Sequence, residues 1–232
     1  KAPNVFILQL SRKEARMAVI TMSRELGTGG GLISQMVVNS INYHLVDKET
    51  IGKVLSQFGL LSFNKVYNST HNVWSLFDSD YRELVKQLNK TILAFAKLDN
   101  TVIIGRGGFV VLKDYQNVLN VLLRAPLEHR IRNAMQTEQI SDIREAEKIV
   151  RHSDEVRESF LQTFYNVNAN SAQFFSLVID TSRVPLHMAA RWIMEAAQEI
   201  DRQKIPPERS SLKADIDPVL LRTVREVLEI KD

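Results

Sequence analysis

A glycine-rich stretch near the N-terminus limits, more than any other feature, what this chain can fold into. Residues 18–22 are apolar and predict a buried strand, and residues 32–41 have the apolar periodicity of a helix. Between them lie four glycines in five positions: Gly27, Gly29, Gly30 and Gly31. A strand, a glycine loop and a helix in this order wrap backbone N–H groups around a phosphate. The stretch therefore predicts a phosphate site in an α/β domain.

The loop departs from the common phosphate-binding pattern, G-x-x-x-x-G-K-[ST]. If Arg24 takes the first Gly position and Gly29 the second, Gly30 stands where Lys is expected. Gly31 then stands where Ser or Thr is expected, so the loop lacks both side chains that normally contact the phosphates and the metal ion. A tight turn that binds nothing is the alternative, although so many glycines carry a conformational cost.

The composition restricts the class of protein. The chain has 232 residues, of which 44% are hydrophobic, so we expect one α/β domain with small appendages. It contains no cysteine, which excludes disulfides and thiolate catalysis and suits a cytoplasmic protein. No apolar run approaches the roughly 18 residues that a membrane span needs. The net charge of +3 without a continuous basic run gives little support to a nucleic-acid partner.

Strand-like and helix-like segments alternate along the chain. Further apolar runs predict strands at residues 43–46, 101–104, 118–123 and 177–179. Amphipathic or capped segments predict helices at residues 80–97, from 126, at 141–164 and at 186–200. This alternation predicts a parallel sheet with right-handed crossovers.

The chain divides into three parts by composition. Residues 18–205 are predicted to form the domain, with residues 1–17 as an extension that adds an edge strand or a packed helix rather than a signal peptide. Residues 206–232 predict a linker and a short amphipathic helix. That helix docks either on the domain or on a partner subunit, which leaves a homo-oligomer open.

Charged residues follow the predicted strands. Ligands of open α/β sheets bind outside the carboxyl ends of the strands. Arginine stands just after four of the five predicted strands: Arg24, Arg106, Arg124 and Arg183. Because the guanidinium fork suits phosphate oxygens, the pattern predicts an anionic ligand at this edge.

The order of the motifs resembles the cytidylate kinase-like family, a branch of the P-loop nucleoside-monophosphate kinases. The matching segments cover residues 18–200 in the right order: ITMSRELGTGGG, YHLVDKETI, VIIGRGGFVVL, VLLRAPLEHRI, a helical segment that reaches HSDEVR, and LVIDTSRVP. The resemblance implies a P-loop NTPase-like three-layer α/β/α fold with a five-stranded parallel sheet. It also implies helical acceptor-binding and lid segments, the lid near residues 136–168.

The resemblance implies a role for each matching position. The donor phosphates would lie on the backbone of Gly27, Thr28, Gly29, Gly30 and Gly31. The acceptor nucleotide would contact Asp47, Lys48 and Arg106, and the donor base would pass Thr181 and Ser182. Cations acting on the transferring phosphoryl group would be Arg24, Arg151 and Arg157. Mg²⁺ would accompany ATP, held mainly by phosphates and waters, and no metal ligand is assigned in the chain.

Some positions depart from the family or allow a structural interpretation. This branch usually has Arg where the chain has Gly31, and Gly107 replaces the aspartate of a GRD motif, so a carboxylate that contacts a pyrimidine is missing. Asp47 fits a ligand contact and a helix cap equally well. The lid arginines could lie on a solvated helix face, and we expect Arg130 to be solvated or ion-paired.

Two classes of function remain. The first is a phosphotransferase that moves the γ-phosphoryl group of ATP to a nucleoside monophosphate such as CMP. The second is a nucleotide sensor or pseudokinase of the same fold, which the losses at Gly30, Gly31 and Gly107 favour. A kinase with a different acceptor is a variant of the first.

Overall fold

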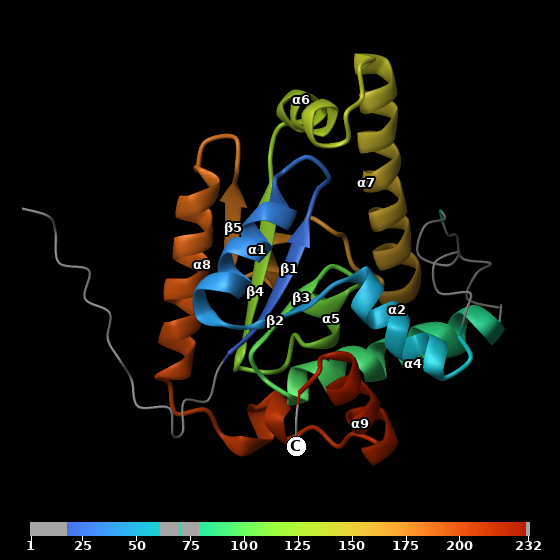
Figure 1. Cartoon of the computed structure of the whole chain (residues 1–232), viewed down its shortest axis with the longest axis vertical. Helices are drawn as coiled ribbons and strands as arrows, with labels where there is room; N and C mark the ends of the chain where they lie inside the picture. Colours follow the sequence, from blue (N-terminus) through green and yellow to red (C-terminus); the bar gives the residue numbers. More distant parts are fainter. Residues whose placement is uncertain (1–17, 61–69, 71–78, 231–232) are drawn as a thin grey trace, which may run out of the picture.

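Five parallel strands form one sheet at the centre of the molecule (Figure 1). The computed structural model describes residues 18–60, 70 and 79–230. The sheet order is β2-β3-β1-β4-β5, and every neighbouring pair is parallel. The strands are β1 (Val19–Arg24), β2 (His44–Val46), β3 (Thr101–Ile104), β4 (Val118–Arg124) and β5 (Leu177–Asp180). The predicted parallel α/β sheet is confirmed, with strand ends that differ by at most two residues.

Helices cover both faces of the sheet, which makes three layers. They are α1 (Gly30–Ile41), α2 (Lys48–Gln57), α4 (Ser79–Lys97), α5 (Gly108–Val111), α6 (Leu127–Thr137), α7 (Ile143–Tyr165), α8 (Leu186–Asp201) and α9 (Pro218–Val227). Helices α1 and α8 cover one face, and α4, α5 and the lower part of α7 cover the other (Figure 1). The short helix α5, which begins directly after Gly107, had no signal in the apolar pattern.

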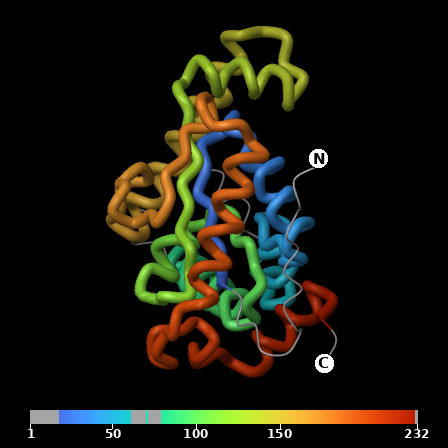
Figure 2. Tube along the Cα trace, turned by 90° about the vertical axis from the view of Figure 1, so that its left-hand side faces the viewer, coloured from blue at the N-terminus to red at the C-terminus, as the bar shows by residue number. Residues whose placement is uncertain are grey.

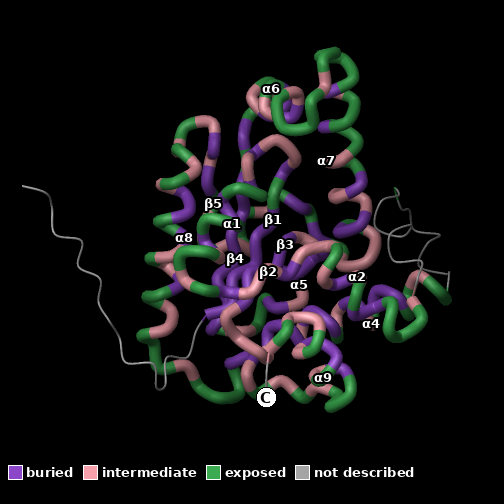
Figure 3. Tube along the Cα trace, viewed as in Figure 1, coloured by how far each residue is buried: buried purple, intermediate pink, exposed green. Residues whose placement is uncertain are grey.

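Successive side chains of β1 point to opposite faces of the sheet and therefore belong to two separate hydrophobic cores. Ile20 and Met22 point to the α1–α8 face and pack with Ile33 and Ile193. Val19 points to the opposite face, in one cluster with residues of α4 and α7. Strands buried on both faces are continuously apolar, which is why the central strands could be predicted from apolar runs in the sequence. Figure 3 shows the central strands largely buried, the edge strands β2 and β5 partly exposed, and the far ends of α6 and α7 exposed.

The chain after α8 closes the end of the molecule opposite α6 and α7 (Figure 2). Ser211 is fully buried, and its hydroxyl donates to the Ala96 carbonyl at 2.8 Å. The backbone N–H of Ser211 donates to Asn117 Oδ1, also at 2.8 Å. Leu220 and Val224 of α9 join the core beneath α4. Of the two alternatives for the C-terminal helix, docking on the domain is the one the structure shows.

Three predictions can be placed only in part or not at all. The N-terminal extension, residues 1–17, lies outside the described residues. So do Trp74 and Phe77, aromatic residues that could line an acceptor pocket but for which we expect hydrophobic packing. In the part of the chain that the structure describes, no helix has the length and apolar character to cross a bilayer.

Two aspartates lie half-buried at the amino ends of the strands. Burial raises the pKa of Asp99 to about 6. Burial also raises the pKa of Asp201 to about 7, against a backbone hydrogen bond from Ala18 that lowers it, and the Asp99 charge adds to the rise. Burial and both aspartates raise the pKa of the Tyr43 hydroxyl as well. The folded chain therefore binds protons here more tightly than the unfolded chain does.

Replacing Asp201 by Asn should raise the unfolding temperature at pH 8, and this gain should shrink as the pH falls toward about 4. The folded pKa of about 7 lies above the unfolded value of 3.8, so the stability that protonation provides is fully present below the unfolded value and is lost as the pH rises from there to about 7. Discounted for partial exposure, the gain at pH 8 is about 1 kcal/mol, or roughly 2–4 °C. Thermal unfolding followed by circular dichroism measures it, and equal unfolding temperatures at pH 8 would contradict the assignment.

Candidate functional site

A cavity of about 880 Å³ opens at the carboxyl ends of β1, β2 and β3, beside α7. Its walls combine residues from the strand ends with one face of α7. The residues that line it include Ser23, Arg24, Asp47, Lys48, Glu49, Gly105, Arg106, Phe109, Lys148, His152 and Arg157. The complete lining holds five Lys and Arg residues and three acidic ones, the third acidic residue being Glu145 of α7, so the balance is positive and the cavity wall suits an anion.

The glycine loop leads from β1 into α1 next to Arg24 and Leu26, which line this cavity, whereas residues 27–31, predicted to hold the donor phosphates, are not part of its lining. Gly29 is the N-cap of α1 and has a φ of 73°, a conformation that disfavours residues with a Cβ. The loop also packs backbone to backbone, because a Cβ on Gly27 would overlap the Arg130 carbonyl of α6. Asn133 of α6 donates a hydrogen bond to the Gly27 carbonyl at 2.9 Å. The glycines are thus required by the shape of the loop and by its neighbour.

The place of the missing lysine is filled by Arg24. A Cβ on Gly30 would overlap Cδ of Arg24, so the aliphatic part of that side chain covers the first residue of α1. Gly31, one residue further, has no atom within 4 Å of an added Cβ. Position 30 therefore excludes a side chain while Arg24 keeps this arrangement, whereas position 31 is open to one.

The hydroxyls near the loop are engaged within it. Thr28 donates to the Glu25 carbonyl at 2.7 Å, and Ser34 donates to the Gly31 carbonyl at 2.8 Å. Among the described residues, no group of three or more His, Asp or Glu side chains is arranged to hold a metal ion. Both hydroxyls are therefore engaged with backbone carbonyls in or next to the loop.

The acceptor side combines a helix cap with two cations. Asp47 caps α2, with Oδ1 accepting from the N–H groups of Glu49 at 3.0 Å and Thr50 at 2.9 Å. Burial, followed by the charge of Arg106, lowers the pKa of Lys48. Arg106 is 8% exposed and has a φ of 57°, an unusual conformation for a residue with a side chain. Because the two positive charges repel each other, an anion bound beside both of them would be stabilised.

Position 107 is closed to a carboxylate. Gly107 has a φ of 73°, and an added Cβ would lie 2.8 Å from Cε2 of Tyr165. The Tyr165 hydroxyl donates to Asn89 Oδ1 at 2.6 Å, which fixes the ring over the glycine. The chain has no aspartate at this position, and the ring of Tyr165 fills the space that an aspartate side chain would need.

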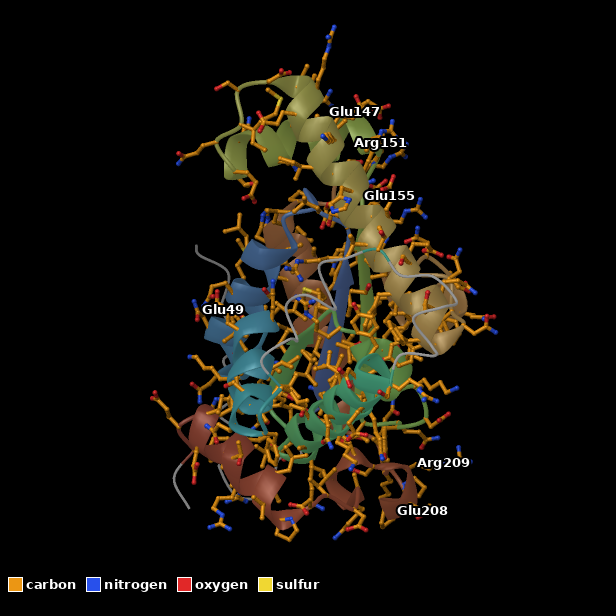
Figure 4. The ribbon with its side chains drawn as sticks, turned by 90° about the vertical axis from the view of Figure 1, so that its right-hand side faces the viewer. Glu49, Glu147, Arg151, Glu155, Glu208 and Arg209 are labelled. Carbon is orange, nitrogen blue, oxygen red and sulfur yellow. The ribbon has the colours of Figure 1, made fainter. Side chains whose placement is uncertain are left out.

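The structure brings some of the sequence-predicted residues together and not others. Arg24, Asp47, Lys48, Arg106 and Arg157 all line the cavity. Arg151 does not, and it forms an ion pair with Glu147 of 2.7 Å on the exposed upper turns of α7 (Figure 4). Thr181 and Ser182 also lie outside its lining, and their hydroxyls bond to the Arg124 carbonyl and to Asp180.

Sequence reasoning missed a buried ionic network behind the loop. Arg130, expected to be solvated or ion-paired, is 6% exposed and forms a bidentate pair with Asp154, at 2.8 and 3.2 Å. Its Nε lies 3.5 Å from Glu25 and donates to the Ala125 carbonyl at 3.1 Å. One signal was available, since an acidic residue inside a phosphate-binding loop needs a cation nearby. The partners themselves lie on separate helices, and no local spacing indicates them.

The chain matches a known family along most of its length. The model of the cytidylate kinase-like family matches residues 19–183. The cytidylate kinase of Pyrobaculum islandicum is 24% identical over 178 residues, covering 75% of this chain and 90% of that protein. The cytidylate kinase of Methanospirillum hungatei JF-1 is 23% identical over 176 residues, covering 71% and 92%.

A solved structure shares the fold. It is an uncharacterized protein from Eubacterium ventriosum, with a TM-score of 0.61 and 18% identity. The match covers 80% of this chain and 99% of the other. At this identity the likeness supports the fold alone.

Replacing Arg130 by Ala should lower the free energy of unfolding by about 3 kcal/mol, because Glu25 and Asp154 lose their shared partner in a largely buried place. The exposed neighbour Arg132 is the control, and Arg132→Ala should change the stability by less than about 0.5 kcal/mol. Urea unfolding measures both. Equal effects of the two variants would show that the network contributes nothing beyond a surface charge.

Proposed function

The chain belongs to the cytidylate kinase-like family, and on that premise we propose that it transfers the γ-phosphoryl group of ATP to a nucleoside monophosphate such as CMP. One observation carries the proposal. Cations from three separate elements, Arg24, Arg106 and Arg157, line one cavity beside a glycine loop at the carboxyl edge of the sheet. Phosphoryl transfer depends on positioning and charge neutralisation, which such an arrangement supplies.

The donor phosphates would lie on the glycine loop. Its backbone N–H groups and the N-terminus of α1 provide a partial positive charge for anions without any side chain. Arg24, which covers Gly30, would supply a cation from outside the loop, close to where the lysine is missing. Mg²⁺ would enter as part of the MgATP substrate. The donor base would extend toward Thr181 and Ser182 after β5.

The acceptor phosphate would lie between Lys48 and Arg106. One of its oxygens attacks the γ-phosphorus in line, the bond from that phosphorus to the β–γ bridging oxygen breaks, and ADP leaves with the bond's electron pair. A phosphate monoester has a second pKa of about 6, so the attacking oxygen is already deprotonated near neutral pH. The reaction therefore needs no general base, and Arg157 would neutralise the charge that develops on the transferring group.

A binding protein without turnover is the second candidate, and a specific observation favours it. Gly30 and Gly31 leave the loop without its own cation, and Tyr165 closes position 107 to the carboxylate of the family motif. Such a protein would hold nucleotide through the loop and never produce ADP.

The deciding experiment combines binding and turnover. Calorimetric titration with MgATP and with CMP measures binding, and ADP release is followed over a panel of monophosphate acceptors. The kinase proposal expects ATP binding and acceptor-dependent ADP formation. Binding without ADP for any acceptor supports the sensor instead, and failure to bind ATP contradicts both candidates.

Replacing Arg106 by Gln should weaken CMP binding at least about thirtyfold and change ATP affinity by less than about threefold, because one charge-assisted phosphate contact is lost on the acceptor side. Arg124→Gln, at the exposed end of β4 and outside the cavity, is the matched control. Calorimetry with each nucleotide separately measures both affinities. An equal loss for the two nucleotides would remove Arg106 from the acceptor site.

Replacing Gly31 by Arg should tighten ATP binding about tenfold, which corresponds to about 1.4 kcal/mol. The position is open, so the new side chain can reach the donor phosphates without displacing a neighbour. Gly31→Gln, which adds a polar side chain without a charge, should change the affinity by less than about twofold. If both variants bind ATP like the wild type, the donor phosphates do not lie at the start of α1.

A further inference from the structure

The glycine loop contains a buried carboxylate that the proposed reaction does not use. Glu25 follows Arg24 directly and is 8% exposed. Its Oε2 accepts a hydrogen bond from the Ala125 N–H at 3.1 Å, which holds the side chain against the start of α6. A negative charge beside a phosphate site repels the ligand unless cations balance it. The contacts of Glu25 therefore decide what it does there.

Two arginines form ion pairs with this carboxylate, one with each of its oxygens. Nε of Arg130 lies 3.5 Å from Oε2, and Nη2 of Arg157 lies 3.8 Å from Oε1. Arg130 is committed to structure, because Asp154 and the Ala125 carbonyl take its remaining donors. Arg157 differs, since its side chain lines the cavity.

Two hydrogen bonds hold the Arg157 side chain, and one of its donors has no partner in the part of the chain that the structure describes. Nη2 donates to Asn170 Oδ1 at 2.9 Å, and Nη1 donates to the Ala169 carbonyl at 3.4 Å. Its Nε is buried, and among the described residues it has no acceptor. Glu25 is the one acidic side chain of the described part of the chain that forms an ion pair with it.

We infer that Glu25 is a positioning residue that holds the guanidinium of Arg157 at the cavity wall, ready for the transferring phosphoryl group. The inference rests on the proposed phosphoryl transfer. Asn170 and the Ala169 carbonyl already hold the guanidinium by hydrogen bonds, and the charge of Glu25 adds to this hold. Fixing a long arginine side chain in advance removes the cost of ordering it from the transition state. The carboxylate itself is not part of the cavity lining, and the Ala125 N–H holds it at the start of α6.

This role predicts a separation of kinetic constants. Glu25→Gln keeps an acceptor for the Ala125 N–H but removes the charge. Loss of a negative charge near the phosphates leaves KM for ATP unchanged or lowers it, while release of Arg157 lowers kcat by about 10–100-fold. A merely structural role would not divide the effect in this way. Glu25→Asp, which keeps the charge, should recover at least half of the lost kcat on a logarithmic scale.

The direct test measures the position of Arg157 without relying on activity. The full chain is treated with phenylglyoxal, which modifies accessible arginines, and the rate at each arginine is followed by peptide mass spectrometry. Glu25→Gln should speed the modification of Arg157 at least about fivefold. Arg151, two turns away on α7 and paired with Glu147, is the internal control and should keep its rate.

Asp154→Asn is the control for general loosening, because it disturbs Arg130 and not Arg157. It should lower the unfolding temperature and leave the rate at Arg157 unchanged. An unchanged Arg157 rate in Glu25→Gln, or an equal rise in Asp154→Asn, would overturn the positioning role.

If Glu25→Gln does not fold, Glu25→Asp replaces it in the rate measurement. An intermediate rise in the Arg157 rate is then expected, and no rise would contradict the role. A wild type that forms no ADP with any acceptor overturns the proposed transfer instead, and the rates at Arg157 still decide whether Glu25 holds it.

Discussion

The close backbone contact between the glycine loop and α6 is the constraint on which the site depends. Because Gly27 has no Cβ, the loop can lie directly against the Arg130 carbonyl. The same arginine then reaches back across the loop to Glu25 and up to Asp154 on α7. Through its carbonyl and its side chain, Arg130 therefore links the loop, α6 and α7 at the edge of the sheet where β1 ends.

In this arrangement the positively charged side chains lie outside the loop, on the elements around it. In the usual phosphate-binding loop, the cation follows the last glycine in the sequence. Here Arg24 covers that position from the strand side, and Arg157 approaches from α7. The loop keeps its backbone donors, and the cations belong to elements that can be varied separately. In the proposed reaction, phosphate binding and phosphoryl transfer would therefore depend on different residues.

The sequence predicts the sheet well and the charge network poorly, for physical reasons. Strands buried on both faces are continuously apolar, so their positions could be read with errors of one or two residues. The sequence could not decide whether Asp47 caps a helix or contacts a ligand, because both roles need a carboxylate just before the helix. In the structure Asp47 caps α2 and also lines the cavity. The pairing of Arg130 with Asp154 joins two helices through tertiary packing, which no local pattern records. The filling of position 107 by Tyr165 likewise depends on where α7 ends.

We propose that the backbone of the glycine loop holds the donor phosphates. A titration of the ¹⁵N-labelled protein with MgADP, followed through the amide resonances of Gly27, Gly29, Gly30 and Gly31, tests this directly. These four amides are expected to shift together and to saturate at one dissociation constant. Glycine amides that stay in place while resonances elsewhere shift would contradict it.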